Sequence, residues 1–284
     1  MSESPLVSPA WLEEHLADPR VVVADVRWYL KGKRGIDAYS TGHIPSACFV
    51  DVDRDLASAP GRGRPGRHPL PSADQFADVL ARIGAAPGDL VVAYDDTGGT
   101  TAARLWWLLR YFGRDGGRVL DGGIQAWTAG GRPLSSDEPK RAPAARTPLT
   151  ARAEMVVDNP RVRAMSEGRT GILLDARASE RFEGITEPVD PRAGHIPGAK
   201  SAPFHANLEE PAGSFRPRGE LEDHYRALGV DDETTVVAYC GTGVTACHDL
   251  LGLAIAGKGD AKLYEGSWSE WASDPSLPAA TGKE

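Results

Sequence analysis

Cys240 is the residue of this chain best placed for covalent chemistry. It follows a short apolar run, residues 236–239, and precedes a loop of glycine and threonine, residues 241–245. A helical pattern continues over about 246–256. At such a junction backbone N–H groups converge and the helix N-terminus carries a partial positive charge, so a thiolate is favoured over a thiol. The spacing predicts a cysteine nucleophile that acts on a small anionic substrate.

The elements that would position this cysteine are expected twice along the chain. In the first half, the pattern predicts helices after Ser8, over 72–83, over 100–112 and around Trp127, with strands over 21–25, 90–94 and 119–120. In the second half, it predicts helices from 158, over about 220–228, over 246–256 and around Trp271, with strands over 172–175, 235–239 and 262–264. Residues 27–42 and 57–71 are expected to form loops. Strands that alternate with helices predict α/β units, each a mostly parallel sheet flanked by helices.

Matched residues indicate that the two halves repeat one fold. Gly-His-Ile-Pro occurs at 42–45 and again at 194–197, and further pairs are Tyr94 with Tyr239 and Trp127 with Trp271. Such a repeat predicts a duplicated unit, here residues 1–135 and 155–284. Residues 136–154, rich in Pro, Arg, Ser and Ala, are expected to form the linker. The position that matches Cys240 holds Asp95, so only the second domain has the nucleophile.

Composition restricts the partners. The chain has 284 residues and a net charge of −8, which argues against nucleic acids and anionic membranes as partners. No apolar run approaches the roughly 20 residues of a membrane-spanning helix, and no signal-peptide pattern precedes residue 8. The three cysteines, Cys48, Cys240 and Cys247, predict a reducing compartment, the cytoplasm, without disulfides. Cys247 and His248 lack further ligands nearby, so no metal site is expected.

Taken together, these features resemble the tandem-domain rhodanese family of sulfurtransferases. The resemblance rests on two copies of Gly-His-Ile-Pro-x-Ala, an acid at the end of each first strand, Cys-Gly-Thr-Gly-Val-Thr-Ala at 240–246 and Glu-Gly-Ser-Trp at 265–268. It covers nearly the whole chain. It implies two rhodanese-like domains and a cysteine persulfide on Cys240, without any other cofactor. Sulfur would pass from a small anionic donor to cyanide or to a thiol acceptor such as thioredoxin.

The residues after the cysteine distinguish branches of this family. Thiosulfate-preferring members have basic residues there, whereas the 3-mercaptopyruvate branch has Cys-Gly-Ser-Gly-Val-Thr. Gly241 agrees with the second branch, and Thr242 replaces its serine while keeping a hydroxyl. The expected donor is therefore 3-mercaptopyruvate, with thiosulfate as the alternative.

The alternatives to a sulfurtransferase are a cysteine phosphatase and a non-enzymatic binding module. A cysteine phosphatase would place arginine six residues after the cysteine, where this chain has Ala246. A non-enzymatic rhodanese-type binding module is a remote alternative, because such a module would not need Cys240.

The site residues are expected as follows. The backbone N–H groups of the loop, at Gly241, Thr242, Gly243, Val244 and Thr245, would form an anion-binding nest for the sulfur. By the resemblance, Arg181 and Arg192 hold the substrate carboxylate, and Thr242 shares a proton relay with His68 and Asp53 from the first half. For the Thr245 side chain, helix capping is the favoured interpretation. A structural role is expected for residues that both copies share, His43 and His195 and likewise Asp25 and Asp175, and Cys48 and Cys247 are expected in the core.

Overall fold

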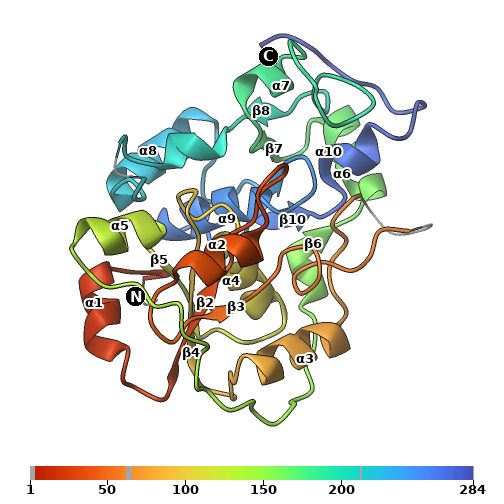
Figure 1. Ribbon diagram of the computed structural model, residues 1–284. Helices are drawn as coiled ribbons and strands as arrows, with labels where there is room; N and C mark the ends of the chain where they lie inside the picture. The colour runs from red at the N-terminus through yellow and green to blue at the C-terminus, as the bar shows by residue number, and fades with distance from the viewer. Residues whose placement is uncertain (1–3, 62–65, 212, 284) are drawn as a thin grey trace. The chain divides into compact units, whose positions relative to one another are not determined.

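The computed structural model describes residues 4–61, 66–211 and 213–283, which form two compact units. Unit 1 contains the residues up to 58, 71–152 and 208–215, and unit 2 contains 59–70, 153–207 and the residues from 216 onward. Each half of the chain therefore contributes one loop segment, 59–70 or 208–215, to the unit formed mainly by the other half. Figure 1 labels most of the helices and strands of both units.

Unit 1 is built on a five-stranded sheet in the order β1-β5-β4-β2-β3, and every strand pair is parallel. Its strands are β1 (Leu6–Val7), β2 (Val21–Asp25), β3 (Cys48–Phe49), β4 (Leu90–Tyr94) and β5 (Gly117–Leu120). Its helices are α1 (Pro9–His15), α2 (Gly35–Thr41), α3 (Ala73–Arg82), α4 (Ala102–Tyr111) and α5 (Gly123–Ala129). Val23, Val92, Tyr94 and Trp127 lie together in the core.

Unit 2 repeats this architecture with the strand order β6-β10-β9-β7-β8, again all parallel. Its strands are β6 (Val156–Val157), β7 (Ile172–Asp175), β8 (Lys200–Ser201), β9 (Val236–Tyr239) and β10 (Lys262–Tyr264). Its α-helices are α6 (Asn159–Gly168), α7 (Ser179–Phe182), α8 (Arg218–Ala227), α9 (Ala246–Ile255) and α10 (Ser267–Trp271), with 3₁₀ turns at Ala153–Met155 and Phe204–Asn207. The predicted fold class, two α/β units with parallel sheets, is confirmed.

Local sequence signals explain where several helices begin. Ser8 accepts a hydrogen bond from the N–H of Trp11, and Ser72 accepts one from Gln75, both at 3.1 Å. Asp158 accepts one from Arg161 at 3.0 Å. Such N-caps satisfy N–H groups that the first helical turn leaves unpaired.

The central strands are buried on both faces because helices cover both sides of a parallel sheet. All four residues of β9 are buried, as are the five of β2. Continuous apolar runs are typical of such strands. The carboxyl ends of parallel strands lie at one edge of the sheet, so the residues that follow β7 and β9 share an edge.

Two stretches differ from the sequence expectation. Residues 27–42 were expected to be a loop, yet they contain α2, which begins with an ion pair between Arg34 and Asp37. The predicted linker packs on unit 1, where Arg141 pairs with Asp89 and the N–H of Arg152 bonds to Tyr111. These contacts bridge residues far apart in sequence, which explains why local composition does not reveal them. Within the loop 57–71, residues 62–65 lie outside the described residues.

The residues shared by both copies have structural roles, as expected. Nδ1 of His195 bonds to the carbonyl of Phe182 at 2.7 Å, and its ring stacks on Phe182. His43 bonds to the carbonyl of Tyr39 at 2.9 Å and stacks on that ring. At the strand ends, Asp25 pairs with Arg27 and Asp175 pairs with Arg177, all four buried. Among the described residues, no helix has the length and apolar character needed to cross a membrane.

Candidate active site

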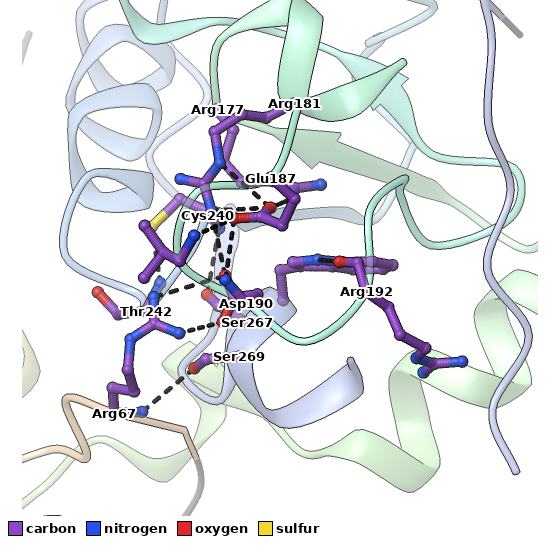
Figure 2. A network of polar contacts seen from close by, with 12 residues as sticks. Arg67, Arg177, Arg181, Glu187, Asp190, Arg192, Cys240, Thr242, Ser267 and Ser269 are labelled. Carbon is purple, nitrogen blue, oxygen red and sulfur yellow. Dashed lines mark hydrogen bonds and ion pairs between the residues drawn. The ribbon is translucent and has the colours of Figure 1, made fainter. Parts of the chain in front are cut away.

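Cys240 lies directly after β9, and its sulfur is held by the loop that follows (Figure 2). Its Sγ accepts hydrogen bonds from the N–H of Thr242 at 3.4 Å and of Gly243 at 3.2 Å. Two of the five expected N–H groups therefore reach the sulfur, and those of Gly241, Val244 and Thr245 make no hydrogen bond to it. Gly243 has φ +80°, and a Cβ there would lie 2.6 Å from the carbonyl oxygen of Glu265. Only glycine fits this close approach.

The turn between β10 and α10 fixes the cysteine loop from the other side. The N–H of Cys240 donates to Oγ of Ser267 at 3.1 Å, and the N–H of Trp268 donates to the carbonyl of Cys240 at 2.9 Å. The N–H of Ser269 donates to the carbonyl of Gly241 at 2.9 Å. Ser267 is fully buried with φ +53°, a conformation rarely adopted by residues with a side chain. Strained residues of this kind concentrate at functional sites.

The helix α9 adds a second thiol behind the loop. Cys247 is fully buried, and its thiol donates to the carbonyl of Gly243 at 3.4 Å. One residue, Gly243, thus contacts both sulfurs, one through its N–H and one through its C=O. Thr245 occupies the N-cap position of α9, but its side chain makes no capping hydrogen bond. The capping interpretation of Thr245 is wrong, because this residue already has helical backbone angles, φ −66° and ψ −24°, whereas a capping residue has extended ones.

The matching loop of unit 1 shows what this backbone is shaped to hold. The carboxylate of Asp95 accepts hydrogen bonds at 2.8–2.9 Å from the N–H groups of Thr97, Gly99, Thr101 and Ala102. The side chain is fully buried after β4, as Cys240 is after β9. The duplicated loop is thus an anion-binding nest in both units. In unit 1 the nest binds the carboxylate of Asp95, and in unit 2 the matching nest binds the sulfur of Cys240.

A chain of alternating charges leads from the end of β7 to the cysteine loop (Figure 2). In order, its members are Asp175, Arg177, Glu187, Arg181, Asp190 and Arg67. Arg181 donates to Glu187 at 2.7 Å and to Asp190 at 3.1 Å, and Arg67 forms an ion pair with Asp190. Buried charges persist only when they are paired in this way. The carboxylates therefore fix the directions in which Arg181 and Arg67 point.

Glu187 stays ionised within this network. Burial by itself would raise the pKa of its carboxyl group. The hydrogen bonds from Arg181 and from the backbone N–H groups of Asp190 and Val189 outweigh burial, and its pKa lies below the ordinary value. The anionic form is thus the one that orients Arg181 at neutral pH.

Arg181 reaches the cysteine loop. A Cβ built on Gly241 would lie 3.6 Å from Nη1 of Arg181. Because glycine has no Cβ, this volume beside Cys240 is free of any side chain of residue 241. The hydrogen bonds of Arg181 use Nε and Nη2, and Nη1 has no acceptor among the residues that the structure describes.

Arg192 does not join Arg181, and its expected role in holding the substrate carboxylate is corrected. Its guanidinium donates to four carbonyl groups, those of Trp271, Ala272, Asp274 and Leu277, at 2.7–2.9 Å. Figure 2 shows the side chain pointing away from Cys240. Arg192 instead satisfies carbonyl groups at and after the C-terminus of α10, where a cation is favourable.

Replacing Arg192 is therefore expected to cost stability rather than donor binding. Arg192→Ala should lower the free energy of unfolding by about 2–4 kcal/mol, since four carbonyl groups lose a charged donor. The KM for the sulfur donor should stay within about twofold of the wild-type value. Denaturant titration and steady-state kinetics measure the two quantities. A large rise in KM for a variant of wild-type stability would restore Arg192 to the binding site.

The proposed relay residues have different surroundings. Thr242 is half-buried beside the sulfur, and within the described part of the chain its hydroxyl has no hydrogen-bond partner. His68 lies in the 59–70 segment of unit 2. Asp53 lies in unit 1, where its carboxylate accepts a hydrogen bond from Nε1 of Trp28 at 2.8 Å. Their cooperation stays a prediction.

Sequence reasoning missed four residues of this site: Arg67, Asp190, Ser267 and Ser269. Arg67 precedes His68, and Asp190 lies between Arg181 and Arg192. Ser267 belongs to the segment 265–268 that carries the family resemblance, and Ser269 directly follows it. The signal that the sequence offers for these four residues is that each lies close to a motif or candidate residue already identified. Among the described residues, no group of three His, Cys, Asp or Glu side chains is arranged to hold a metal ion.

Comparisons with known proteins agree with this architecture. The profile of the rhodanese-like domain matches residues 8–130 and 158–274. A probable 3-mercaptopyruvate sulfurtransferase from Pseudomonas aeruginosa is 43% identical over 289 residues, covering 99% of this chain and 100% of the relative. A putative thiosulfate sulfurtransferase, SseB, from Mycobacterium tuberculosis is 40% identical over 272 residues, covering 93% of this chain and 92% of the relative. The crystal structure of SseA from Escherichia coli, a 3-mercaptopyruvate sulfotransferase, matches with a TM-score of 0.82 at 30% identity, covering 94% of this chain and 100% of that one.

Proposed function

Because this chain belongs to the rhodanese family of sulfurtransferases, we propose that it takes sulfur from 3-mercaptopyruvate and passes it on through a persulfide on Cys240. The observation that carries this choice of donor is the space beside Gly241. Nη1 of Arg181 faces it at 3.6 Å from the position of a Cβ, and residues 241–246 contain no Lys or Arg. A carboxylate is the group that a guanidinium edge recognises best.

The sulfur-transfer step needs no oxidant. The Cys240 thiolate attacks the thiol sulfur of the donor, an S–S bond forms, and the C–S bond breaks with its electron pair left on carbon as the enolate of pyruvate. A proton then converts the enolate to pyruvate. An acceptor thiolate attacks the outer sulfur of the persulfide, and the S–S bond breaks toward Cys240, which restores the thiolate. This is covalent catalysis in two displacements.

The loop stabilises the sulfur at each stage. The N–H groups of Thr242 and Gly243 donate to Sγ of the resting cysteine, and neighbouring N–H groups lie within the same loop for the outer sulfur. Preorganised donors of this kind cost no rearrangement during the reaction. Arg181 holds the carboxylate, so the donor sulfur is presented to Cys240 in one orientation.

Proton transfer to the enolate is assigned to Thr242 with His68 and Asp53 behind it. The Thr242 N–H contacts Sγ, which puts its side chain beside the reacting atoms. Imidazole is suited to proton exchange near neutral pH. Asp53 would orient that imidazole.

A comparison of donors tests the proposal. The value of kcat/KM is measured for 3-mercaptopyruvate and for thiosulfate with the same thiol acceptor, and we expect mercaptopyruvate to be favoured by about 10-fold or more. A higher value for thiosulfate would establish the alternative, which the name of the Mycobacterium tuberculosis relative favours. Mass spectrometry that finds no added sulfur with either donor would favour a binding module.

Substitutions at Thr242 separate its hydroxyl from its shape. Thr242→Val keeps the volume but removes the hydroxyl, and kcat with mercaptopyruvate should fall about 10²-fold because the enolate loses its proton donor. Thr242→Ser should retain most of the activity. Thiosulfate leaves no carbanion, so its kcat should change little in either variant. Equal losses for both donors would show that Thr242 acts on the loop and not on the proton.

The acceptor and the compartment are proposed on chemical grounds. A thiol such as that of reduced thioredoxin fits the second displacement. All three cysteines are free, which supports a reducing compartment, the cytoplasm.

A further inference from the structure

A small hollow lies in unit 2 beside the start of β7. It has a volume of about 180 Å³ and is lined by the end of α6, the first residues of β7 and the turn that leads into β8. Gly171, which directly precedes β7, is part of the lining, whereas Cys240 follows the carboxyl end of β9. Because β7 and β9 are parallel neighbours, the hollow and Cys240 lie at opposite ends of these strands. The hollow is therefore separate from the candidate active site.

Two cationic side chains line this hollow. Arg169 comes from the end of α6, and Lys200 comes from β8. Neither side chain forms a hydrogen bond or an ion pair with the residues that the structure describes. No Asp or Glu is found in the described lining, although the whole chain carries a net charge of −8. Two unpaired cations beside one cavity attract a small anion.

The backbone of Arg169 gives a second, independent observation. Arg169 ends α6 in the left-handed conformation, with φ +49° and ψ 41°. Glycine is the usual residue where a helix ends in this way, because a residue with a side chain is strained there. The backbone geometry therefore does not account for an arginine at this position.

The matching positions of unit 1 carry no cation. The helix N-caps of the two units match Arg169 with Pro19. The strand registers match Lys200 with Cys48. At this end of unit 1 the linker packs on the sheet, where Arg141 donates to the first carbonyl group of β2. The duplicated fold thus forms without this pair of cations, so packing does not explain their presence in unit 2.

We propose that this hollow binds a small carboxylate with a short carbon chain. Arg169 and Lys200 bind the carboxylate, for which a guanidinium and an ammonium are suitable donors. A volume of about 180 Å³ has room for about six groups the size of a water molecule, which suits an acid of three or four carbons. The side chains of Met165, Ile172 and Leu173 give the carbon chain an apolar wall. This inference does not depend on the identity of the sulfur donor.

A methionine of the lining provides the measurement. The protein is labelled with ¹³C at the methionine methyl groups, so that Met165 reports on the hollow and Met155, in the 3₁₀ turn before β6, is the internal reference. Butyrate should shift the Met165 signal along a saturable curve with a Kd of about 1–10 mM. Butyramide has the same shape without the charge and should leave this signal in place. A Met165 signal that ignores butyrate, or that responds equally to butyramide, would overturn the proposal.

Three variants separate the two cations from the fold. Lys200→Glu keeps a charge on the edge strand β8, which protects the edge from aggregation, and should weaken butyrate binding about 10-fold or more. Arg169→Gly should weaken it about 3- to 10-fold. The matched control is Arg163→Ala, since Arg163 is an exposed arginine of α6 paired with Glu167, and it should leave the affinity unchanged. Unchanged affinity in both Lys200→Glu and Arg169→Gly would refute the site.

The thermal stability of Arg169→Gly distinguishes ligand binding from a structural role. A cation near the C-terminus of α6 is favourable by itself. If the side chain serves the ligand, glycine should relieve the left-handed backbone, and Tm should rise by about 1–3 °C while butyrate binding weakens. A lower Tm with unchanged affinity would show that Arg169 stabilises the helix, and the proposal would fail.

Arg181→Ala keeps the active site out of this result. The variant removes the guanidinium proposed to hold the donor's carboxylate, at the other end of the strands. Its Met165 titration should match that of the wild type, whether or not mercaptopyruvate proves to be the donor. In Arg169→Gly and Lys200→Glu, kcat/KM for sulfur transfer should stay within about twofold of the wild-type value. Loss of the Met165 response in Arg181→Ala would assign the effect of butyrate to the active site and overturn a separate binding site.

Discussion

Cys240→Ser is expected to abolish sulfur transfer from every donor, with kcat lower by about 10³-fold or more. The serine hydroxyl fits the space but is not ionised at neutral pH, so the N–H groups of Thr242 and Gly243 no longer face a nucleophilic anion. Intact-protein mass spectrometry after exposure to donor should show one added sulfur on the wild type and none on the variant. Steady-state assays with both donors complete the measurement.

Cys48→Ser is the control for this experiment. Cys48 is buried in unit 1, where its thiol donates to the carbonyl of Ile83 at 3.8 Å, and serine keeps a donor there. This variant should still acquire one sulfur. Appreciable turnover by Cys240→Ser, or added sulfur located on Cys48 or Cys247, would refute Cys240 as the nucleophile.

The fold could be predicted from the sequence wherever burial alone decides the local structure. The runs that became β2, β4, β7 and β9 are apolar throughout, since helices cover both faces of a parallel sheet. A candidate nucleophile, Cys240, could be proposed for a different reason. A repeat that matches elsewhere but has Asp95 opposite Cys240 singles out Cys240 as a candidate for chemistry, whereas residues that both copies share are expected to serve packing.

Elements that depend on contacts distant in sequence could not be predicted. The Arg-rich stretch before unit 2 has the composition of a linker, yet its Arg146 reaches Asp74 and Asp78 on α3. The helix α2 is short and polar, so it has little apolar periodicity to reveal it. In both cases, the partners that stabilise the segment determine its structure.

The arginines of the site show the same limit. Arg192 stands where a family pattern suggests a carboxylate ligand, but in the folded chain four carbonyl groups occupy its guanidinium. Arg67 is 123 residues away from Asp190 in the sequence, yet the two form an ion pair beside Cys240. Spacing can identify the residue type that a site needs. Spacing cannot show which of several arginines already has its guanidinium bonded to carbonyl groups of the protein and so cannot bind a substrate.

The loop after β4 in unit 1 and the matching loop after β9 in unit 2 also connect the stability of the fold to its chemistry. In unit 1, the carboxylate of Asp95 occupies its nest and caps the first turn of α4 through Thr101 and Ala102. In unit 2, the equivalent position carries the sulfur of Cys240, which in the proposed function changes between thiolate and persulfide. The same backbone geometry thus binds a carboxylate in one copy and a cysteine sulfur in the other.

Asp95→Ala tests this reading and is expected to destabilise unit 1 by about 3–5 kcal/mol, because four buried N–H groups lose their acceptor at once. Asp95→Asn should cost less, since its amide oxygen still accepts from part of the nest. Hydrogen exchange measured by mass spectrometry resolves the effect, with amides of α4 expected to exchange faster. Amides of α9 in unit 2 serve as the internal reference and should keep their protection. If α4 exchanged no faster in Asp95→Ala than in the wild type, the carboxylate would not be what holds that loop, and the parallel between the two nests would fail with it.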